Sequence, residues 1–203
     1  MYKLLTISLF FVALVSYGQH QKADTQSKER LQSITGKSDI PPDSVMNNSF
    51  VAANGEKFLC LEIVVDTSLT EVWKMIATEN GLTKWIAPVV LLDLRFGGTV
   101  KTNYTTTAKI GDKGTITLDI ISYVPYEMII FKVSLNDAFA EKCRKEDRNL
   151  QEIIQVKSLG GNKTKITSTM AGWGYGKEWD ETYQFFEKGN KWTFQELLKC
   201  FKQ

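Results

Sequence analysis

The C-terminal stretch from Lys177 to Gln203, KEWDETYQFFEKGNKWTFQELLKCFKQ, constrains the fold more than any other part of the chain. Its apolar residues stand at positions 179, 183, 186, 194, 197, 198 and 201, which is the spacing of one face of a helix. Gly189 interrupts this run, and we expect it to allow a kink. A helix with a single apolar face has to bury that face against another element. The rest of the sequence must therefore supply a matching apolar surface.

The middle of the chain reads as short strands joined by tight turns. Alternating or apolar segments occur at about 56–65, 89–96, 99–109, 115–124, 127–135, 150–159 and 163–171, and Gly160–Gly161–Asn162 joins the last two. Connections this short are typical of antiparallel hairpins. We expect an α+β fold in which a curved antiparallel sheet and the C-terminal helix bury their apolar faces against each other.

Two short helices are expected between the first two of these strands. Thr67 or Ser68 can cap a helix start, and Glu71, three residues after Ser68, would complete a capping box. After a break at Asn80–Gly81, a second short helix should end before Pro88. At the end of the strand that follows, Gly97–Gly98 would permit a tight turn or a bulge that bends the sheet.

The first residues, MYKLLTISLFFVALVSYGQ, have the layout of a secretory signal peptide: Lys3, an apolar run to Val15, and small residues up to Gly18. The run is shorter than the roughly 20 apolar residues of a membrane span, which favours cleavage near Gly18 over an uncleaved anchor. We expect a signal peptide at 1–18, a flexible polar leader at 19–50 and a folded domain at 51–203. The mature protein would be exported, periplasmic or secreted, without an integral membrane span. The ending YGQ resembles signal peptides of Bacteroidetes-type bacteria.

Several kinds of chemistry are disfavoured by composition. The formal charge is +2 and no block of basic residues occurs, so we expect no nucleic-acid partner. The only histidine is His20, in the leader, which leaves the domain without a Ser-His-Asp triad or a histidine-ligated metal. We expect neither a metal nor another cofactor. Cys60, Cys143 and Cys200 could form one disulfide with a free thiol, or could all stay reduced.

Five segments together resemble one known family: VWKMIATENGLTKWIAP, LDLRFGG, ISYVPYEMIIF, KTKITSTMAGW and ELLKCF. Their order and spacing are similar to the START-like (SRPBCC) superfamily, in the branch named for homologues of the activator of the heat-shock-protein-90 ATPase. The resemblance covers roughly residues 55–203. It implies a helix-grip fold, in which a sheet and a long C-terminal helix enclose a deep cavity. Members bind lipids or other hydrophobic small molecules, and some are polyketide cyclases or aromatases.

Candidate ligand-binding residues follow from this reading, and each has a structural alternative. Asp93 and Arg95 lie two apart on an expected strand, so they form either a surface ion pair or a polar pair at the cavity mouth. We expect most of the tryptophans to be core residues, with Trp85 as the exception at the edge of the pocket. The candidates for the cavity or its rim are Trp73, Trp85, Asp93, Arg95, Tyr104, Phe139, Trp173, Trp179 and Tyr183.

Three functions remain open at this point. The first is binding of a hydrophobic or amphipathic small molecule or lipid in the cavity, without catalysis. The second is a cyclase or hydro-lyase, which needs an acid and a proton donor converging on one substrate atom. The third is a cell-envelope interaction module, with a homodimer as one arrangement. The candidate acids and donors for the second are Asp93, Asp119, Glu178, Tyr104, Tyr123 and Tyr183.

Overall fold

The computed structural model describes residues 44–202, and within them the dominant element is one antiparallel sheet. The expected signal peptide and most of the leader lie outside the described residues. The strand order is β1-β3-β9-β8-β7-β6-β5-β4, and β2 also pairs with β3. The strands are β1 (Met46–Asn47), β2 (Phe50–Val51), β3 (Lys57–Val65), β4 (Val89–Leu92), β5 (Thr99–Asn103), β6 (Ile116–Val124), β7 (Met128–Val133), β8 (Gln151–Gly160) and β9 (Lys163–Ala171).

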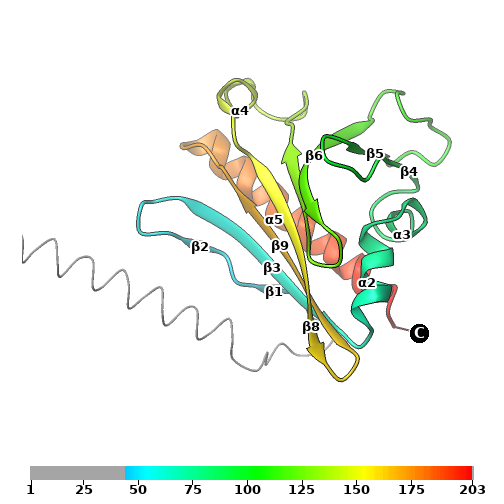
Figure 1. The fold of residues 1–203 in the computed structure, drawn as a ribbon. Coiled ribbons are helices and arrows are strands. Elements are labelled where there is room, and N and C mark those ends of the chain that lie inside the picture. Colours follow the sequence, from blue (N-terminus) through cyan, green and yellow to red (C-terminus); the bar gives the residue numbers. More distant parts are fainter. Residues whose placement is uncertain (1–43, 203) are drawn as a thin grey trace, which may run out of the picture. The chain divides into compact units, whose positions relative to one another are not determined.

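Four helices accompany the sheet in the described part of the chain. They are α2 (Leu69–Ile76), α3 (Glu79–Leu82), α4 (Glu141–Glu146) and α5 (Lys177–Lys199). Figure 1 shows the long helix α5 lying along one face of the curved sheet, with α2 and α3 beyond its C-terminal half. This arrangement confirms the expected α+β helix-grip fold, with two short helices after the strand at 57–65. The break between these helices lies at Ala77–Thr78 and not at Asn80–Gly81, because the Thr78 side chain caps α3 by accepting from the Gly81 N–H.

The apolar core lies between α5 and the inner face of the sheet. Alternate residues of each strand point inward, as the pleat requires. On β3 these are Leu59, Leu61, Ile63 and Val65, all nearly inaccessible to solvent. From α5 the buried side chains are Trp179, Thr182, Phe194, Leu197 and Leu198. The two apolar patterns read from the sequence therefore cover each other.

The start of α2 follows the expected cap. The Ser68 side chain accepts a hydrogen bond from the Glu71 backbone N–H at 3.3 Å. The Glu71 carboxylate pairs with Lys74 at 2.7 Å, one turn further along the helix. An N-cap serine satisfies one of the helix's unpaired N–H groups, which is why α2 begins at Leu69.

Some element boundaries differ from those expected. The sheet begins before residue 51, because Met46–Asn47 and Phe50–Val51 both pair with β3. β4 ends at Leu92, so Asp93 and Arg95 lie in the turn that follows and not on a strand. β5 ends at Asn103 because its Oδ1 accepts from the Thr105 N–H at 3.0 Å, a side-chain turn that replaces the ladder.

No disulfide joins Cys60, Cys143 and Cys200 in the described residues. Within residues 44–202, no helix has the length and apolar character needed to cross a membrane.

Two glycines should respond oppositely to substitution by alanine. A Cβ at Gly98 would stand 2.0 Å from the Asp93 carbonyl oxygen, whereas one at Gly189, inside α5, meets nothing within 4 Å. We expect Gly98→Ala to lower the free energy of unfolding by about 1–3 kcal/mol through overpacking. Gly189→Ala should raise it by about 0.5–1 kcal/mol, because glycine is unfavourable inside a helix. Urea unfolding of both variants beside the wild type measures this, and equal effects of one sign would contradict the packing described.

Candidate functional site

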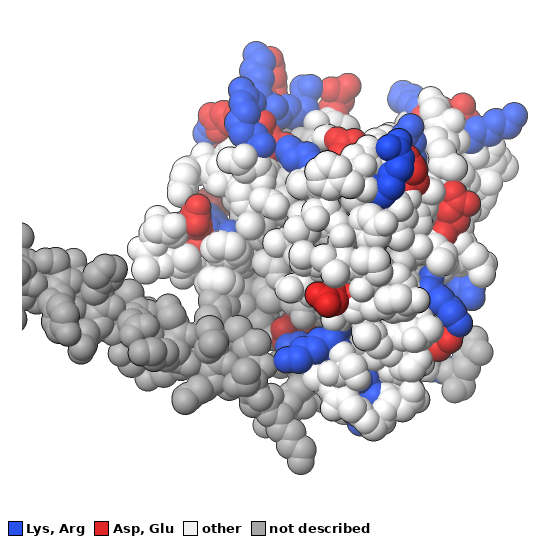
Figure 2. Space-filling view, in the orientation of Figure 1, with Lys and Arg blue, Asp and Glu red and all other residues white. Residues whose placement is uncertain are grey.

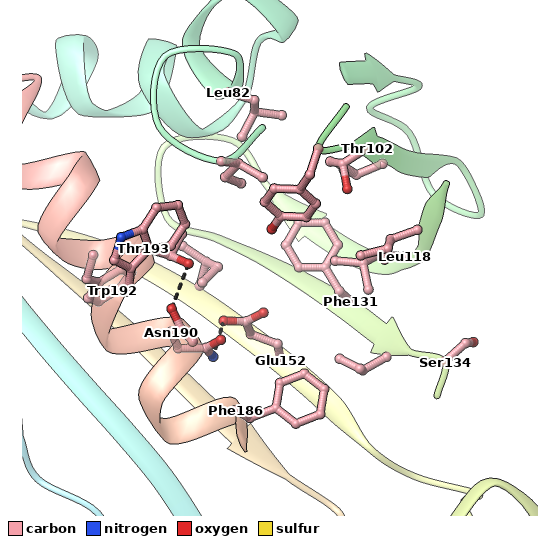
Figure 3. A pocket seen from close by; sticks show the side chains of 18 of the residues that line it. Leu82, Thr102, Leu118, Phe131, Ser134, Glu152, Phe186, Asn190, Trp192 and Thr193 are labelled. Carbon is pink, nitrogen blue, oxygen red and sulfur yellow. Dashed lines mark hydrogen bonds between the residues drawn. The ribbon is translucent and has the colours of Figure 1, made fainter. Parts of the chain in front are cut away.

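A cavity of about 570 Å³ separates the middle of α5 from the inner face of the sheet. Strands β5 to β8 form one wall, the segment after α2 forms a second, and α5 closes the third. Figure 3 shows side chains from these walls converging on a common space. The lining residues are Ile76, Leu82, Trp85, Ile86, Val100, Thr102, Tyr104, Ile116, Leu118, Ile129, Phe131, Val133, Ser134, Asn136, Ala138, Phe139, Glu152, Ile154, Phe185, Phe186, Gly189, Asn190, Trp192, Thr193 and Phe194.

The cavity exists because α5 carries small and polar residues where its apolar face would otherwise continue. Between Phe186 and Phe194, the helix presents Gly189, Asn190 and Thr193 to the sheet. The Thr193 hydroxyl donates to the Gly189 carbonyl at 2.9 Å, so it is satisfied within the helix. Apart from Trp192, which stands at the mouth, this stretch presents no large side chain to the sheet, so the space between helix and sheet stays unfilled.

The mouth of the cavity is marked by aromatic residues that both line it and face solvent. The exposed fractions of Tyr104, Phe185 and Trp192 are 53%, 60% and 49%. On the face drawn in Figure 2, acidic and basic side chains are interspersed, with mostly uncharged surface across the middle. The exposed aromatic residues therefore distinguish the mouth chemically from this charged surface.

Packed aromatic rings line one end of the cavity. The Phe139 ring lies parallel to that of Phe186, with centroids 5.4 Å apart, and edge-on to that of Phe185. The loop that carries Phe139 is held at its base by Lys132 on β7, whose Nζ contacts Asp147 at 2.7 Å. Lys132 also donates to the Leu150 carbonyl. The loop thus has a fixed base, from which Phe139 reaches α5.

Trp85 forms part of the opposite wall. It is buried, and its indole N–H donates to the Met75 carbonyl at 2.9 Å, at the C-terminal end of α2. The polar edge of the ring is therefore satisfied by protein, and its apolar surface is available to the cavity.

The only ionisable carboxyl group in the described lining is that of Glu152. Glu152 lies on β8 two positions before the buried Ile154, so its side chain is on the inward face of the strand. Figure 3 shows this side chain reaching toward α5. Its Oε1 accepts from the Ser168 hydroxyl at 2.6 Å and from Asn190 Nδ2 at 3.2 Å. Burial raises the pKa of Glu152, and the Ser168 hydrogen bond offsets only part of that effect.

Tyr104 shares the electrostatics of this site. Although about half of the residue is exposed at the mouth, the pKa of its phenol is raised by burial and by the negative charge of ionised Glu152. A raised phenol pKa keeps the hydroxyl protonated at neutral pH, so Tyr104 can donate a hydrogen bond to a bound molecule.

The structure separates the residues singled out from the sequence into two groups. Trp85, Tyr104 and Phe139 line the cavity. Asp93 and Arg95 form an exposed ion pair at 2.8 Å in the turn after β4. The remaining candidates are also outside the lining: Trp73 packs on Tyr126, Trp173 packs edge-on against Tyr183, and the Trp179 indole donates to Glu146 at 2.9 Å.

The acidic residues proposed from the sequence also lie outside the cavity lining. Asp93, Asp119 and Glu178 do not line the cavity, whereas Glu152, which the sequence analysis passed over, does. The sequence does indicate this position. In QEIIQVK, Glu152 is separated from Ile154 and Val156 by even numbers of residues, so all three side chains lie on the same, inward face of the strand. Within residues 44–202, no three metal-ligating side chains cluster.

Solved structures show which proteins share this architecture. The Aha1 dimer from Colwellia psychrerythraea matches with a TM-score of 0.53 and 14% identity, covering 72% of this chain and 98% of that one. CalU16 from Micromonospora echinospora matches with 0.54 and 14%, covering 78% and 83%. EF2215 from Enterococcus faecalis, a conserved protein of unknown function, matches with 0.55 and 10%, covering 75% of each chain. Identities this low show a shared fold.

The family is shown by the sequence itself. Comparison with curated proteins found no match. A family profile, however, matches residues 66–202 and is described as activator of Hsp90 ATPase homolog 1-like protein. This match runs from the end of β3 to the end of the described domain, and so includes every wall of the cavity. The chain therefore belongs to the family of activator of Hsp90 ATPase homolog 1-like proteins.

Proposed function

We propose that this protein binds a hydrophobic or amphipathic small molecule in the cavity between α5 and the sheet. The observation that carries the proposal is a cavity of about 570 Å³ whose lining is mostly aliphatic and aromatic. Cavities of this size and composition are typical of small-molecule sites. A few polar groups, those of Glu152, Asn190 and Tyr104, would orient the molecule.

The position of the polar groups favours an amphipathic molecule over a uniformly apolar one. Glu152 and Asn190 lie on facing elements, β8 and α5, while the end near Phe139 and Phe186 is aromatic. A molecule with a ring or chain as its body and one polar group would match both regions. Its entrance would be the mouth between Tyr104 and Trp192.

The compartment belongs to the same proposal. The N-terminal pattern of Lys3, an apolar run and Gly18 supports export to the periplasm or the exterior. There the protein would hold or deliver its molecule outside the cytoplasm. A homodimer is compatible with this role, since binding in an internal cavity leaves the outer face of the sheet for contacts between subunits.

Filling the cavity from α5 should abolish binding. Nile red, a neutral fluorophore that brightens in apolar sites, serves as the probe. We expect saturable Nile red binding by the wild type and by Gly189→Ala, and at least roughly tenfold weaker binding by Gly189→Leu. Leucine is nearly as favourable as alanine in a helix, so the added volume is the main difference between the two variants. Fluorescence titration with parallel circular dichroism measures this; equal binding by all three would place the probe outside the cavity and oppose the proposal.

An enzyme acting on a cavity-bound ring compound is the second candidate. The observation that favours it is that an acid, Glu152, and a hydroxyl donor, Tyr104, occupy one cavity and interact electrostatically. Mass spectrometry of the small molecule that co-purifies with the wild type and with Glu152→Gln separates the two functions. A binding protein should retain the same molecule in both, whereas an enzyme should retain unconverted substrate in the variant.

A stable dimer with no molecule and no Nile red binding would instead support the third candidate function, the interaction module.

A further inference from the structure

The Glu152 carboxyl group is placed in the cavity without a cationic partner. Its contacts come from two neutral donors, the Ser168 hydroxyl and the Asn190 amide, and no lysine or arginine lines the cavity in the described residues. An ionised carboxylate in apolar surroundings is costly unless a positive charge or several hydrogen bonds compensate it. The neutral acid is therefore the form that these surroundings favour.

The two hydrogen bonds give the two carboxyl oxygens of Glu152 different surroundings. Both donors point at Oε1: Ser168 Oγ at 2.6 Å and Asn190 Nδ2 at 3.2 Å. Oε1 is thereby the acceptor oxygen of the acid. Oε2 has no hydrogen-bond partner among the described residues, and it belongs to a side chain that lines the cavity. With both groups donating to Oε1, the proton of the neutral acid sits on Oε2, as a donor without an acceptor.

The supporting residues come from three different elements. Ser168 lies on β9 next to β8, and its hydroxyl is fully buried, so its geometry is determined by the sheet. Asn190 approaches from α5, across the cavity. Phe131 stands opposite Glu152 in the pairing of β7 with β8, so the two side chains lie next to each other on the same face of the sheet. The carboxyl group is thus held in place before any molecule binds, which reduces the entropy lost when one does.

We propose that Glu152 acts as a neutral hydrogen-bond donor, through Oε2–H, to a carbonyl or similar acceptor oxygen on the bound molecule. This inference rests on the proposed binding function and specifies its ligand class: an apolar molecule with a hydrogen-bond acceptor, such as a ketone, ester or amide. Tyr104, at the mouth of the same cavity, supplies a second donor hydroxyl. Amines are disfavoured by this assignment, because an amine would need the ionised carboxylate.

A matched pair of probes tests the donor directly. In 2-acetylnaphthalene a ketone oxygen replaces the methylene group of 2-isopropenylnaphthalene, with the same ring and nearly the same shape. We expect the wild type at mildly acidic pH to bind the ketone roughly 5- to 10-fold more tightly than the alkene, as one net hydrogen bond allows. Titrations followed by amide chemical shifts give both affinities and show whether the shifts map to the cavity.

Substitutions at Glu152 give the control. Glu152→Gln keeps an acceptor for Ser168 and Asn190 and supplies an N–H donor that does not titrate. It should keep the ketone preference at every pH, whereas the wild type should lose its preference as the pH rises and Oε2 loses its proton. Glu152→Met should bind both probes equally. Glu181→Gln, which removes an exposed carboxylate of α5, should behave as the wild type.

The outcomes separate this inference from the function on which it rests. If the wild type binds both probes equally, or if 2-(aminomethyl)naphthalene binds more tightly than the ketone, the donor role is wrong while the binding function stands. If neither naphthalene nor Nile red binds the wild type, the binding function itself fails. A ketone preference that survives in Glu152→Met would assign the donor to another residue, and Tyr104→Phe would then identify it.

Stability against pH gives a test that needs no ligand. The unfolded chain releases the Glu152 proton near its ordinary pKa of 4.5, whereas the folded protein, with its raised pKa, retains the proton to higher pH. Over the interval between these pKa values the folded state binds more protons, so raising the pH destabilises it. We expect the unfolding free energy of the wild type to fall relative to that of Glu152→Gln from about pH 4.5 upward. Urea unfolding over a pH series measures this, and a constant difference would show that folding leaves the pKa of Glu152 unchanged.

Discussion

The packing of α5 on the sheet is the contact on which the rest of the molecule depends. Trp179 near one end of the helix and Phe194, Leu197 and Leu198 near the other are buried in the core. Between them, Gly189 and its neighbours leave the sheet uncovered. The helix is anchored by large buried side chains near both ends, and around Gly189 it presents only small or polar side chains to the sheet, so a gap remains there. The cavity is therefore a consequence of the spacing of side-chain sizes along one helix, and it needs no irregular backbone.

A single buried carboxyl group gives this apolar space its chemical character. Around Glu152 the protein provides hydrogen bonds from Ser168 and Asn190 but no positive charge. Such an arrangement lowers stability compared with an apolar side chain at the same position, because desolvating an acid is unfavourable even in its neutral form. Groups that are costly in this way are frequent at functional sites, where their environment shifts pKa values to suit a bound molecule. The interaction of Glu152 with Tyr104 extends this environment to the mouth of the cavity.

Family membership and function rest on different parts of the structure. The fold is shared with the Aha1 dimer of Colwellia psychrerythraea and with CalU16 of Micromonospora echinospora, at identities of 14% in both cases. Similarity of this kind reflects strand order and helix packing, which hold the scaffold together. The ligand class depends on a handful of side chains that line the cavity, and these can change while the scaffold persists. The ligand class therefore depends on residues such as Glu152, Asn190 and Gly189, and not on the shared fold.

The sequence by itself determined the architecture, because strand and helix periodicities are local and are repeated along many residues. Alternation predicted the sheet, the spacing from Trp179 to Phe201 predicted its covering helix, and Ser68 marked the start of α2. Only the tertiary structure decided how the strands are placed against α5, and so which inward-facing side chains lie opposite each part of the helix. Trp85, Tyr104 and Phe139 come together from three distant segments, and the charge of Glu152 becomes significant only beside Ser168 and Asn190. Local patterns show that a side chain points inward; long-range packing decides whether that interior is filled or hollow.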